Sequence, residues 1–323
     1  MRAVVVEEYS EQPDFHVLEV EEPTPSEDVV TVRVRGAGCN YSDLLMASGS
    51  YQVKPPLPFI PGSEIAGEVF DPGTGETRLA AGQRVFGFSG LNAFAELAPG
   101  PISYLYPIPE AMSFAEAAVL PIAYGTAYAG LHLRARLEAN ETVVVHGAAG
   151  GTGRAAVELA KAAGARVLAV TSNSEKARVA LEAGADAVLE ADDDDLIQRV
   201  REATGGGADV VFDPVGDHHT LDALRYLAWG GRIVSLGFVG GSIPEVPTNR
   251  LLLKNASLLG LNLAGYGFQE PAVFPRIFES LIKLWTEGSI RPLVHKTFPL
   301  DGAREALLLL QSRSVMGKLA ITP

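Results

Sequence analysis

Three glycines in the middle of the chain have the spacing of a phosphate-binding turn. Gly150, Gly151 and Gly153 lie in the stretch AAGGTG, between the apolar run 142–146 and an alanine-rich amphipathic segment. Such strand-to-helix turns use glycine where the backbone approaches a pyrophosphate and where the helix packs closely on the strand, and the helix N-terminus offers N–H groups to the phosphates. Together with Thr152, these glycines predict a dinucleotide-binding site, because the strand and helix supply the required context.

The end of the next predicted strand indicates which dinucleotide binds. Sites for NAD place an acidic residue about 20 residues after the turn, where it accepts a hydrogen bond from the ribose 2′-OH. Here the strand 166–170 runs into TSNSEK, in which Ser172 can donate to a 2′-phosphate and Lys176 can neutralise it. These residues favour NADPH. Two alternatives stay open: Ser172 caps the following helix, and Lys176 is a solvated helix charge. Glu175 opposes NADPH unless it only caps that helix.

Composition restricts the class of protein. The chain has 323 residues, of which 47% are hydrophobic and 20% charged, so it is long enough for two globular domains. Its net charge of −13 argues against a nucleic-acid binder. The single cysteine, Cys39, excludes a disulfide framework and a cysteine-rich zinc site. No apolar run is long enough to cross a membrane, and the charged N-terminal stretch is unlike a secretory signal, so we expect no membrane association and a cytoplasmic protein.

The predicted strands and helices fall into two regions of the chain, and the glycine turn lies in the second. The first ~120 residues predict a small barrel-like β domain, because short apolar runs alternate with glycine and proline. Strands are expected at 29–38, 64–70, 83–88 and 93–98. From there on, strands alternate with helices, which predicts a parallel sheet covered on both faces. We expect strands at 142–146, 166–170, 186–190, 208–213, 231–237 and within 251–263, and helices at 151–163, 174–183, 194–203 and 220–227.

The alternation of strands and helices stops after Gly265. Helices are then expected at 271–287 and 301–311, and a final strand at 317–322 that returns to the N-terminal β domain. We therefore assign residues 1–120 and 265–323 to one domain and 121–264 to an inserted dinucleotide-binding domain. His146, which ends the strand before the turn, is expected in a core or supporting position rather than a catalytic one.

Several stretches resemble sequence motifs of one known family, and they occur along this chain in the same order as in the family. They are GAGCNYSDLLMASGSY, PFIPGSEIAGEV, YGTAYAGL, HGAAGGTG, SNSEKARVALEAGAD, ADVVFDPVG, GGRIVSLG and RPLVHKTFPLDGAREALLLLQSRSVMGKLAI. The chain resembles the zinc-independent quinone oxidoreductases of the medium-chain dehydrogenase/reductase (MDR) superfamily. The resemblance implies an α/β fold, with a GroES-like β-barrel catalytic domain and an inserted Rossmann-type, doubly wound parallel sheet. It also implies a homodimer joined through the nucleotide-binding sheets.

The positions that bind zinc in related alcohol dehydrogenases carry other residues here. Those enzymes have a cysteine three residues before an aspartate, whereas this chain has Asn40 before Asp43, and Cys39 is displaced by one residue. Their Gly-His-Glu motif is replaced by one that contains Ser63 and Glu64. We therefore predict no metal at this site.

The resemblance also suggests roles for individual residues. It implies Asn40 and Tyr51 as catalytic hydrogen-bond donors, with Tyr41 as a further candidate, although Tyr51 could instead only pack against the proline-rich loop. It implies cofactor contacts for Thr126, Val215, Gly237, Phe238, Val239 and Lys318. For Thr126 the alternative is a hydroxyl bonded to its own helix, and for Lys318 a position away from the cofactor is equally open.

One departure weakens the expectation of NADPH. The family often has Asn-Tyr after its third strand, where the tyrosine helps to hold the 2′-phosphate, but this chain has Leu189, Glu190 and Ala191. The sequence nevertheless predicts an NADPH-dependent reductase of quinones or other conjugated carbonyls, with small-molecule substrates. The alternatives are an enoyl-thioester or 2-alkenal reductase of the same superfamily and a non-catalytic, NADPH-binding regulatory protein.

Overall fold

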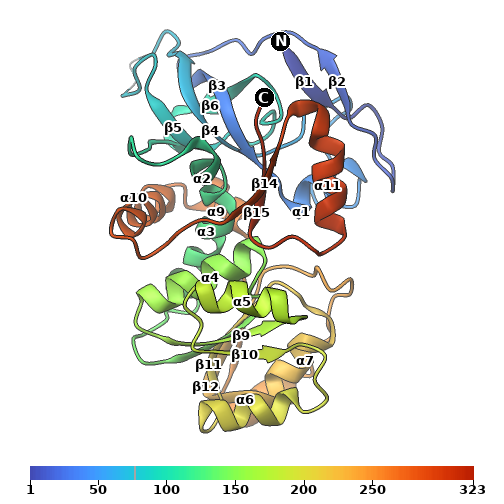
Figure 1. Cartoon of the computed structure of the whole chain (residues 1–323), viewed down its shortest axis with the longest axis vertical. Coiled ribbons are helices and arrows are strands. Elements are labelled where there is room, and N and C mark those ends of the chain that lie inside the picture. Colours follow the sequence, from blue (N-terminus) through green and yellow to red (C-terminus); the bar gives the residue numbers. More distant parts are fainter. Residues whose placement is uncertain (76–77) are drawn as a thin grey trace. The chain divides into compact units, whose positions relative to one another are not determined.

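The computed structural model describes residues 1–75 and 78–323 and contains two compact units (Figure 1). Unit 1 comprises Met1–Ile122 and Pro292–Pro323, and unit 2 comprises Ala123–Arg291. The chain leaves unit 1 within helix α3 (Leu120–Tyr128) and returns after Arg291. Unit 2 is thus an insertion in unit 1, as the sequence predicts.

Unit 1 is built on a mostly antiparallel sheet with short helices at its margins. Its strands are β1 (Arg2–Val5), β2 (His16–Glu19), β3 (Val29–Gly38), β4 (Glu64–Asp71), β5 (Arg84–Phe88), β6 (Leu97–Pro101), β7 (Leu105–Pro107), β14 (Val294–Phe298) and β15 (Lys318–Ile321). Its helices are α1 (Tyr41–Ala47), α2 (Phe114–Ala118), α11 (Ala303–Gln311) and the 3-10 turns η1 (Ile102–Tyr104) and η3 (Leu300–Gly302).

The C-terminal strand of the chain pairs with an N-terminal strand. The sheet order is β14-β15-β3-β4-β5-β7, with β6 also on β3 and with β1 and β2 forming a separate pair. Ala320 and Ile321 of β15 lie opposite Gly38 and Ala37 of β3 in antiparallel register. The predicted return of the last strand is confirmed, and it brings residue 318 close to residues 39 and 40.

Unit 2 contains a six-stranded parallel sheet. Its strands are β8 (Thr142–His146), β9 (Arg166–Thr171), β10 (Ala187–Glu190), β11 (Ala208–Asp213), β12 (Leu227–Ser235) and β13 (Ser257–Gly260). Their order is β10-β9-β8-β11-β12-β13, the doubly wound order in which the direction of winding reverses between β8 and β11. Ligands of such sheets bind outside the carboxyl ends of the strands at this reversal point.

Helices cover both faces of that sheet. Those of unit 2 are α4 (Gly151–Ala162), α5 (Ser174–Glu182), α6 (Leu196–Thr204), α7 (Asp217–Tyr226), α8 (Thr248–Lys254), α9 (Leu263–Gln269), α10 (Val273–Thr286) and the π-helix η2 (Ala129–Arg134). Figure 1 shows α4 and α5 on one side of the strands and α6 and α7 on the other. The strands are apolar on both faces for this reason: β8 is buried at all of its positions.

Of two predictions about the segment after the sheet, one is confirmed and one is wrong. The strand predicted within 251–263 is β13, although helix α8 occupies the start of that stretch. Residues 265–291 belong to unit 2 rather than to the β domain. The physical reason is packing: α10 buries Ile277, Phe278 and Leu281. The hydroxyl of Tyr128 on α3 donates to Ser280 Oγ of α10 at 3.2 Å.

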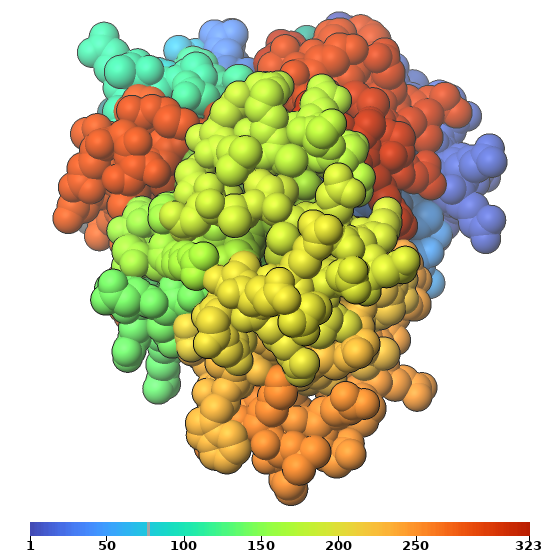
Figure 2. Space-filling model, turned by 60° about the horizontal axis from the view of Figure 1, so that its bottom comes forward, coloured from blue at the N-terminus to red at the C-terminus, as the bar shows by residue number. Residues whose placement is uncertain are grey.

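Several large apolar side chains of unit 2 remain exposed near its edge strand β13. Leu252 and Leu253 on α8 are 77% and 68% exposed, and Phe268 on α9 is 85% exposed. Figure 2 shows the orange segments that carry them at the molecular surface. None of the helices in the described residues is both long and apolar enough to span a membrane.

Candidate active site and cofactor site

The glycine turn lies at the reversal point of the unit 2 sheet, directly after β8. Gly150 caps α4 with an extended backbone (φ −74°), and its N–H donates to the carbonyl of Gly147 at 3.0 Å. A Cβ on Gly153 would clash with that same carbonyl, so Gly153 is required for close packing of helix on strand. A Cβ on Gly150 would meet only Gly147 O, at 3.5 Å, so the space beside Gly150 is open.

This arrangement fits a pyrophosphate. The N–H groups in the first turn of α4 have no acceptors within the helix, and the helix dipole favours an anion at that end. Gly151 and Thr152 are the first two residues of the helix, so their N–H groups point to the open side of the turn. The turn is therefore a cradle in which backbone groups, rather than side chains, supply the contacts.

Ser172 and Lys176 form a polar pair after the neighbouring strand β9. Lys176 Nζ donates to Ser172 Oγ at 3.0 Å. The alternative that Ser172 caps the next helix is wrong, because Asn173 holds the N-cap position of α5 and its side chain accepts from the N–H of Lys176 at 2.9 Å. The pair thus presents a cation and a hydroxyl together at the carboxyl edge of the sheet. The phosphate-binding role predicted for it is not tested by these contacts.

The loops after β11 and β12 are joined to each other. Val215 O accepts from the N–H of Gly240 at 2.8 Å, and Pro214 O accepts from the N–H of Val239 at 3.3 Å. Phe238 lies against Gly216, where a Cβ would meet its ring at 2.7 Å. The structure therefore brings together Val215 and the segment from Gly237 to Val239, as the sequence predicts for residues around one cofactor.

Thr126, the remaining cofactor candidate of unit 2, lies half-buried on α3. Its hydroxyl makes no hydrogen bond to other groups in the described part of the chain, so the alternative of a bond to its own helix is not observed. A contact with the cofactor stays a prediction.

Unit 1 contains a buried cluster of charged and polar side chains, which we call the Lys318 cluster: Asn40, Asp43, Glu64 and Lys318. Asp43 and Glu64 are fully buried, and Asn40 and Lys318 are 8% and 7% exposed. The ammonium of Lys318 donates to Asn40 Oδ1 at 2.5 Å, to Glu64 Oε1 at 3.0 Å and to the carbonyl of Cys39 at 2.7 Å. All three ammonium hydrogens therefore have acceptors within unit 1.

The backbone of unit 1 completes the cluster. Glu64 Oε2 accepts from the N–H of Ile122 at 2.8 Å, and Asp43 Oδ2 accepts from the N–H of Asn40 at 2.8 Å. Gly38 makes room for the Glu64 carboxylate, because a Cβ there would clash with Oε1. Sequence reasoning did not find this pairing of Glu64 with Lys318, since the two residues are 254 positions apart.

Burial controls the ionisation of two groups beside Lys318. Burial raises the pKa of Asp43 to about 7, although the hydrogen bond from the Asn40 N–H and the charge of Lys318 act in the opposite direction. Asp43 Oδ1 has no hydrogen-bond partner in the described residues, in keeping with a carboxyl that is partly protonated near neutral pH. Burial likewise raises the pKa of the Cys39 thiol, so Cys39 is an unreactive thiol in the core.

The two predicted catalytic residues lie in different surroundings. Asn40 is committed to the Lys318 cluster: its Nδ2 donates to Glu64 Oε1 at 2.9 Å and to Gly38 O at 3.3 Å. Tyr51 is half-buried against the unit 1 core, and within the described residues its hydroxyl has no hydrogen-bond partner. Burial, with a smaller effect from Asp43, raises the pKa of Tyr51, so this hydroxyl is a proton-bearing donor. Tyr41 begins α1 and is 37% exposed.

The residues at the zinc positions do not fit a zinc ion. A zinc site requires three or four thiolate, imidazole or carboxylate ligands, but these positions hold the Asn40 amide and the Ser63 hydroxyl. The Lys318 ammonium lies 3.0 Å from the Glu64 carboxylate and would repel a second cation. No group of three histidine, cysteine, aspartate or glutamate side chains in the described residues could hold a metal ion.

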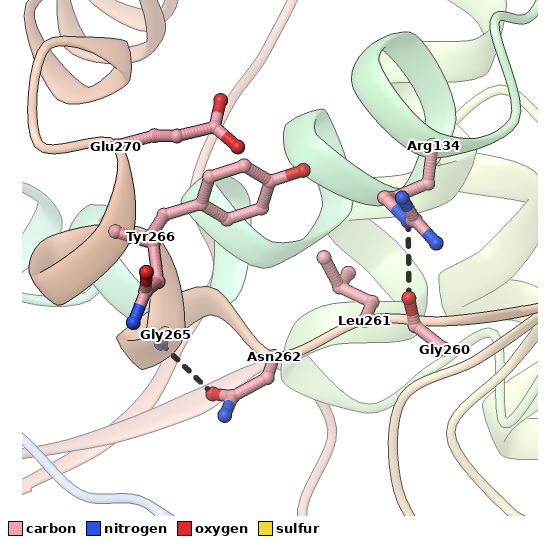
Figure 3. A pocket seen from close by; sticks show the side chains of 8 residues that line it. Arg134, Gly260, Leu261, Asn262, Gly265, Tyr266 and Glu270 are labelled. Atoms are coloured by element: carbon pink, nitrogen blue, oxygen red, sulfur yellow. Dashed lines mark hydrogen bonds between the residues drawn. The ribbon is translucent and has the colours of Figure 1, made fainter.

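A pocket with no predicted site residue lies on unit 2 at the carboxyl end of β13. It is lined by Arg134, Gly260, Leu261, Asn262, Gly265, Tyr266, Gln269 and Glu270. Figure 3 shows the Tyr266 ring extending from α9 toward the side that carries Arg134. The Arg134 guanidinium is held by Gly260 O at 3.0 Å, and Asn262 caps α9. These contacts explain the pocket as the junction of η2, β13 and α9.

The fold and the two sites define the class of protein. A doubly wound sheet with a pyrophosphate cradle, inserted into a GroES-like β domain, is the architecture of a dinucleotide-dependent dehydrogenase or reductase. Residues 26–110 match the family model "Alcohol dehydrogenase GroES-like domain", and residues 151–282 match "Zinc-binding dehydrogenase". The chain belongs to the quinone oxidoreductase type of the medium-chain dehydrogenase/reductase superfamily.

Three relatives illustrate this membership. Mouse quinone oxidoreductase-like protein 2 is 40% identical over 91% of this chain and 84% of its own length. The Escherichia coli quinone oxidoreductase structure, a complex with NADPH, is 29% identical with a TM-score of 0.91, and all of both chains is covered. The CurK enoyl reductase structure is 25% identical with a TM-score of 0.88, covering 99% of this chain and 98% of its own.

Proposed function

We propose that this protein is a zinc-independent, NADPH-dependent reductase of quinones or other conjugated carbonyls. The observation that carries the proposal is that the glycine turn, the Ser172–Lys176 pair and the loops after β11 and β12 all lie at the carboxyl edge of the sheet, on both sides of its reversal point. The NADPH complex of the Escherichia coli relative supports the choice of cofactor. Homodimer formation and a cytoplasmic location remain predictions.

The residues of unit 2 fit NADPH in distinct ways. The first turn of α4 would hold the pyrophosphate through its N–H groups, and Lys176 with Ser172 would hold the 2′-phosphate (Nζ to Oγ 3.0 Å). Glu190 ends β10 in register with Thr171 of β9, so one carboxylate lies on the adjacent strand and lowers the preference for a phosphate. We therefore expect a preference for NADPH over NADH rather than an exclusive requirement.

The chemistry requires a hydrogen-bond donor for the substrate oxygen. When bound, NADPH would supply a hydride, and the carbonyl oxygen of the substrate would then gain negative charge. Preorganised donors at that oxygen lower the barrier. We assign this role to Tyr51, because its hydroxyl is protonated and without a partner in the described residues. Asn40 has both amide hydrogens engaged in the Lys318 cluster, so we assign it to the support of the site.

The charges of unit 1 support zinc independence. The ammonium of Lys318 is bonded to the Asn40 amide, which stands at one of the zinc positions, and to the carboxylate of Glu64, which follows the other, Ser63. The ammonium of Lys318 compensates the charge of the buried Glu64 carboxylate without a metal ion. The catalytic step then depends on hydrogen bonding, not on a Lewis acid.

The proposed homodimer would use the edge of the unit 2 sheet. Among the described residues, strand β13 has a neighbour on one side only, and an unpaired edge is a template for a second chain. The exposed Leu252, Leu253 and Phe268 lie on the two helices that flank β13 in sequence. Burial of these side chains would supply apolar contact area for such a pairing.

Turnover with a defined set of acceptors tests the proposal. NADPH and NADH oxidation is followed at 340 nm with quinones, enones and enoyl thioesters, for the wild type and for Lys176→Ala. We expect quinone- or enone-dependent oxidation of NADPH, and a roughly tenfold rise in the NADPH KM of the variant with little change for NADH. Preferred turnover of enoyl thioesters would favour the enoyl reductase alternative, which the CurK likeness supports. NADPH binding without turnover of any acceptor would favour a regulatory protein.

A further inference from the structure

A buried hydrogen-bonded cluster lies directly behind the glycine turn of unit 2. It consists of His146, Asp213, Thr220 and Tyr226, which we call the Asp213 cluster. All four are at most 2% exposed. His146 and Asp213 are the last residues of β8 and β11, the two strands at the reversal point of the sheet, and the other two residues are on α7.

The Asp213 carboxylate joins three elements. Its Oδ1 accepts from the N–H groups of Val215 and Gly216, both at 3.0 Å, and lies 3.1 Å from His146 Nδ1. Its Oδ2 accepts from the Thr220 hydroxyl at 2.5 Å. Burial alone would raise the pKa of Asp213, but His146 and these donors outweigh burial and lower the pKa to about 2. The carboxylate is therefore ionised, and its hydrogen bonds are of the strong, charge-assisted kind.

His146 is held at both ring nitrogens. Burial raises the pKa of the Tyr226 hydroxyl well above its ordinary value, so this hydroxyl keeps its proton and donates to His146 Nε2 at 2.6 Å. An imidazole that accepts at Nε2 carries a proton on Nδ1, which then donates to Asp213. This arrangement determines one tautomer and one orientation of the ring at the end of β8.

The clamped ends of β8 and β11 lead into the cofactor loops. His146 is followed by Gly147, whose carbonyl accepts from Gly150 and defines the approach of Gly153. A Cβ on Gly147 would meet Val215 Cγ2 at 3.5 Å, so the two turns lie close together. Val215 in turn binds the N–H of Gly240 in the loop that contains Phe238. The Asp213 carboxylate is thereby connected to three segments predicted to touch the cofactor: the glycine turn, the 214–216 turn and the loop that contains Phe238.

We propose that Asp213 is a positioning residue for NADPH: it holds the glycine turn and the 214–216 turn at the spacing that the dinucleotide requires. This inference rests on the proposed function of unit 2 as an NADPH site. It adds one residue that does not touch the cofactor but determines its affinity. The competing possibility is that the cluster only stabilises the core.

Three variants separate positioning from stability. Asp213→Ala removes the acceptor for Val215 and Gly216. Asp213→Asn keeps an acceptor oxygen there but loses the charge. Tyr226→Phe is the matched control, because it removes a hydrogen bond on the far side of the imidazole and leaves the 214–216 turn untouched. For each protein, the NADPH Kd is measured by cofactor fluorescence, the Tm by calorimetry, and kcat and KM at saturating acceptor.

We expect the NADPH Kd of Asp213→Ala to rise at least 30-fold, that of Asp213→Asn to rise about fivefold, and that of Tyr226→Phe to stay within twofold despite a lowered Tm. The NADPH KM should follow the Kd, whereas kcat at saturating NADPH should change less than threefold. An Asp213→Ala Kd within threefold of wild type, or equal weakening by Tyr226→Phe, overturns the inference. If Asp213→Ala does not fold, Asp213→Asn against Tyr226→Phe decides by the same comparison. A wild type that fails to bind NADPH would overturn the proposed function instead.

Discussion

The two units handle charge in opposite ways. Unit 1 encloses Lys318, Glu64 and Asp43, so its polar site is made of ionisable side chains, of which Lys318 and Glu64 are bonded to each other. The cradle of unit 2 uses backbone N–H groups at a helix end, and its Asp213 cluster stays behind the turn. The difference teaches that the proposed pyrophosphate site is made of backbone groups that cannot titrate, whereas the buried ionisable groups of both units hold structure in place.

That contrast has consequences for mutation and for pH. Removing one member of a closed set of buried charges leaves another charge without compensation, which is among the costliest changes a protein can undergo. Altering a glycine in the cradle changes shape without changing charge. Stability should therefore respond mainly to unit 1 and cofactor affinity mainly to unit 2.

Replacement of Lys318 should have the largest effect on stability. Lys318→Met leaves Glu64 buried without its cation, and we expect a loss of about 3–5 kcal/mol in the free energy of unfolding. The measurement is urea unfolding at pH 7. The double variant Lys318→Met/Glu64→Gln removes both charges and should recover a substantial part of that loss. The NADPH Kd of Lys318→Met tests separately whether Lys318 contacts the cofactor.

If Lys318→Met lowers the free energy of unfolding by less than about 1 kcal/mol, the assignment of Lys318 and Glu64 as a buried ion pair would be contradicted. Contributions that small are typical of ion pairs on the protein surface. Equal losses in the single and double variants would mean that packing, not charge, is responsible. Either result would mean that the buried charges of unit 1 do not dominate the stability of the protein.

Asp43 should make the protein less stable as the pH rises. Its pKa is about 7 in the folded chain against an ordinary 3.8, so the folded state binds more protons between these values. The free energy of unfolding therefore falls as the pH rises from about 4 to about 7, by at most about 4 kcal/mol from this residue. In Asp43→Asn this part of the slope should vanish. Unfolding midpoints at half-unit pH steps provide the comparison, and an unaltered slope would speak against a protonated Asp43.

The glycine turn should show the smallest effect on stability and a selective effect on binding. Gly150→Ala places a methyl group in the open side of the cradle, so we expect the NADPH Kd to rise roughly 10- to 100-fold with a nearly unchanged Tm. Gly153→Ala puts its methyl group against the Gly147 carbonyl, so it should lower both the Tm and the affinity. Full NADPH affinity in Gly150→Ala would mean that the cradle does not hold the pyrophosphate.

Features local in the chain could be predicted from the sequence. The strands and helices of unit 2 and the turn from Gly150 to Gly153 follow from periodicity and glycine spacing, which act over a few residues. Within 251–263 the strand was predicted but helix α8 was not, because an apolar run has no periodicity that separates helix from strand, and contacts with the sheet decide between them. The helix α10 was assigned to the wrong unit because its apolar face is equally compatible with either neighbour until packing chooses α3.

By itself, the sequence determined that the chain has an inserted doubly wound domain with a pyrophosphate turn, because these depend on local propensity and spacing. Only the tertiary structure decided how the buried charges pair. Lys318 meets Glu64 and Asn40 through the pairing of β15 with β3, and Asp213 meets His146 because β11 lies beside β8. Strand order is set by which apolar faces can be buried together, a property of the whole fold that no local pattern encodes.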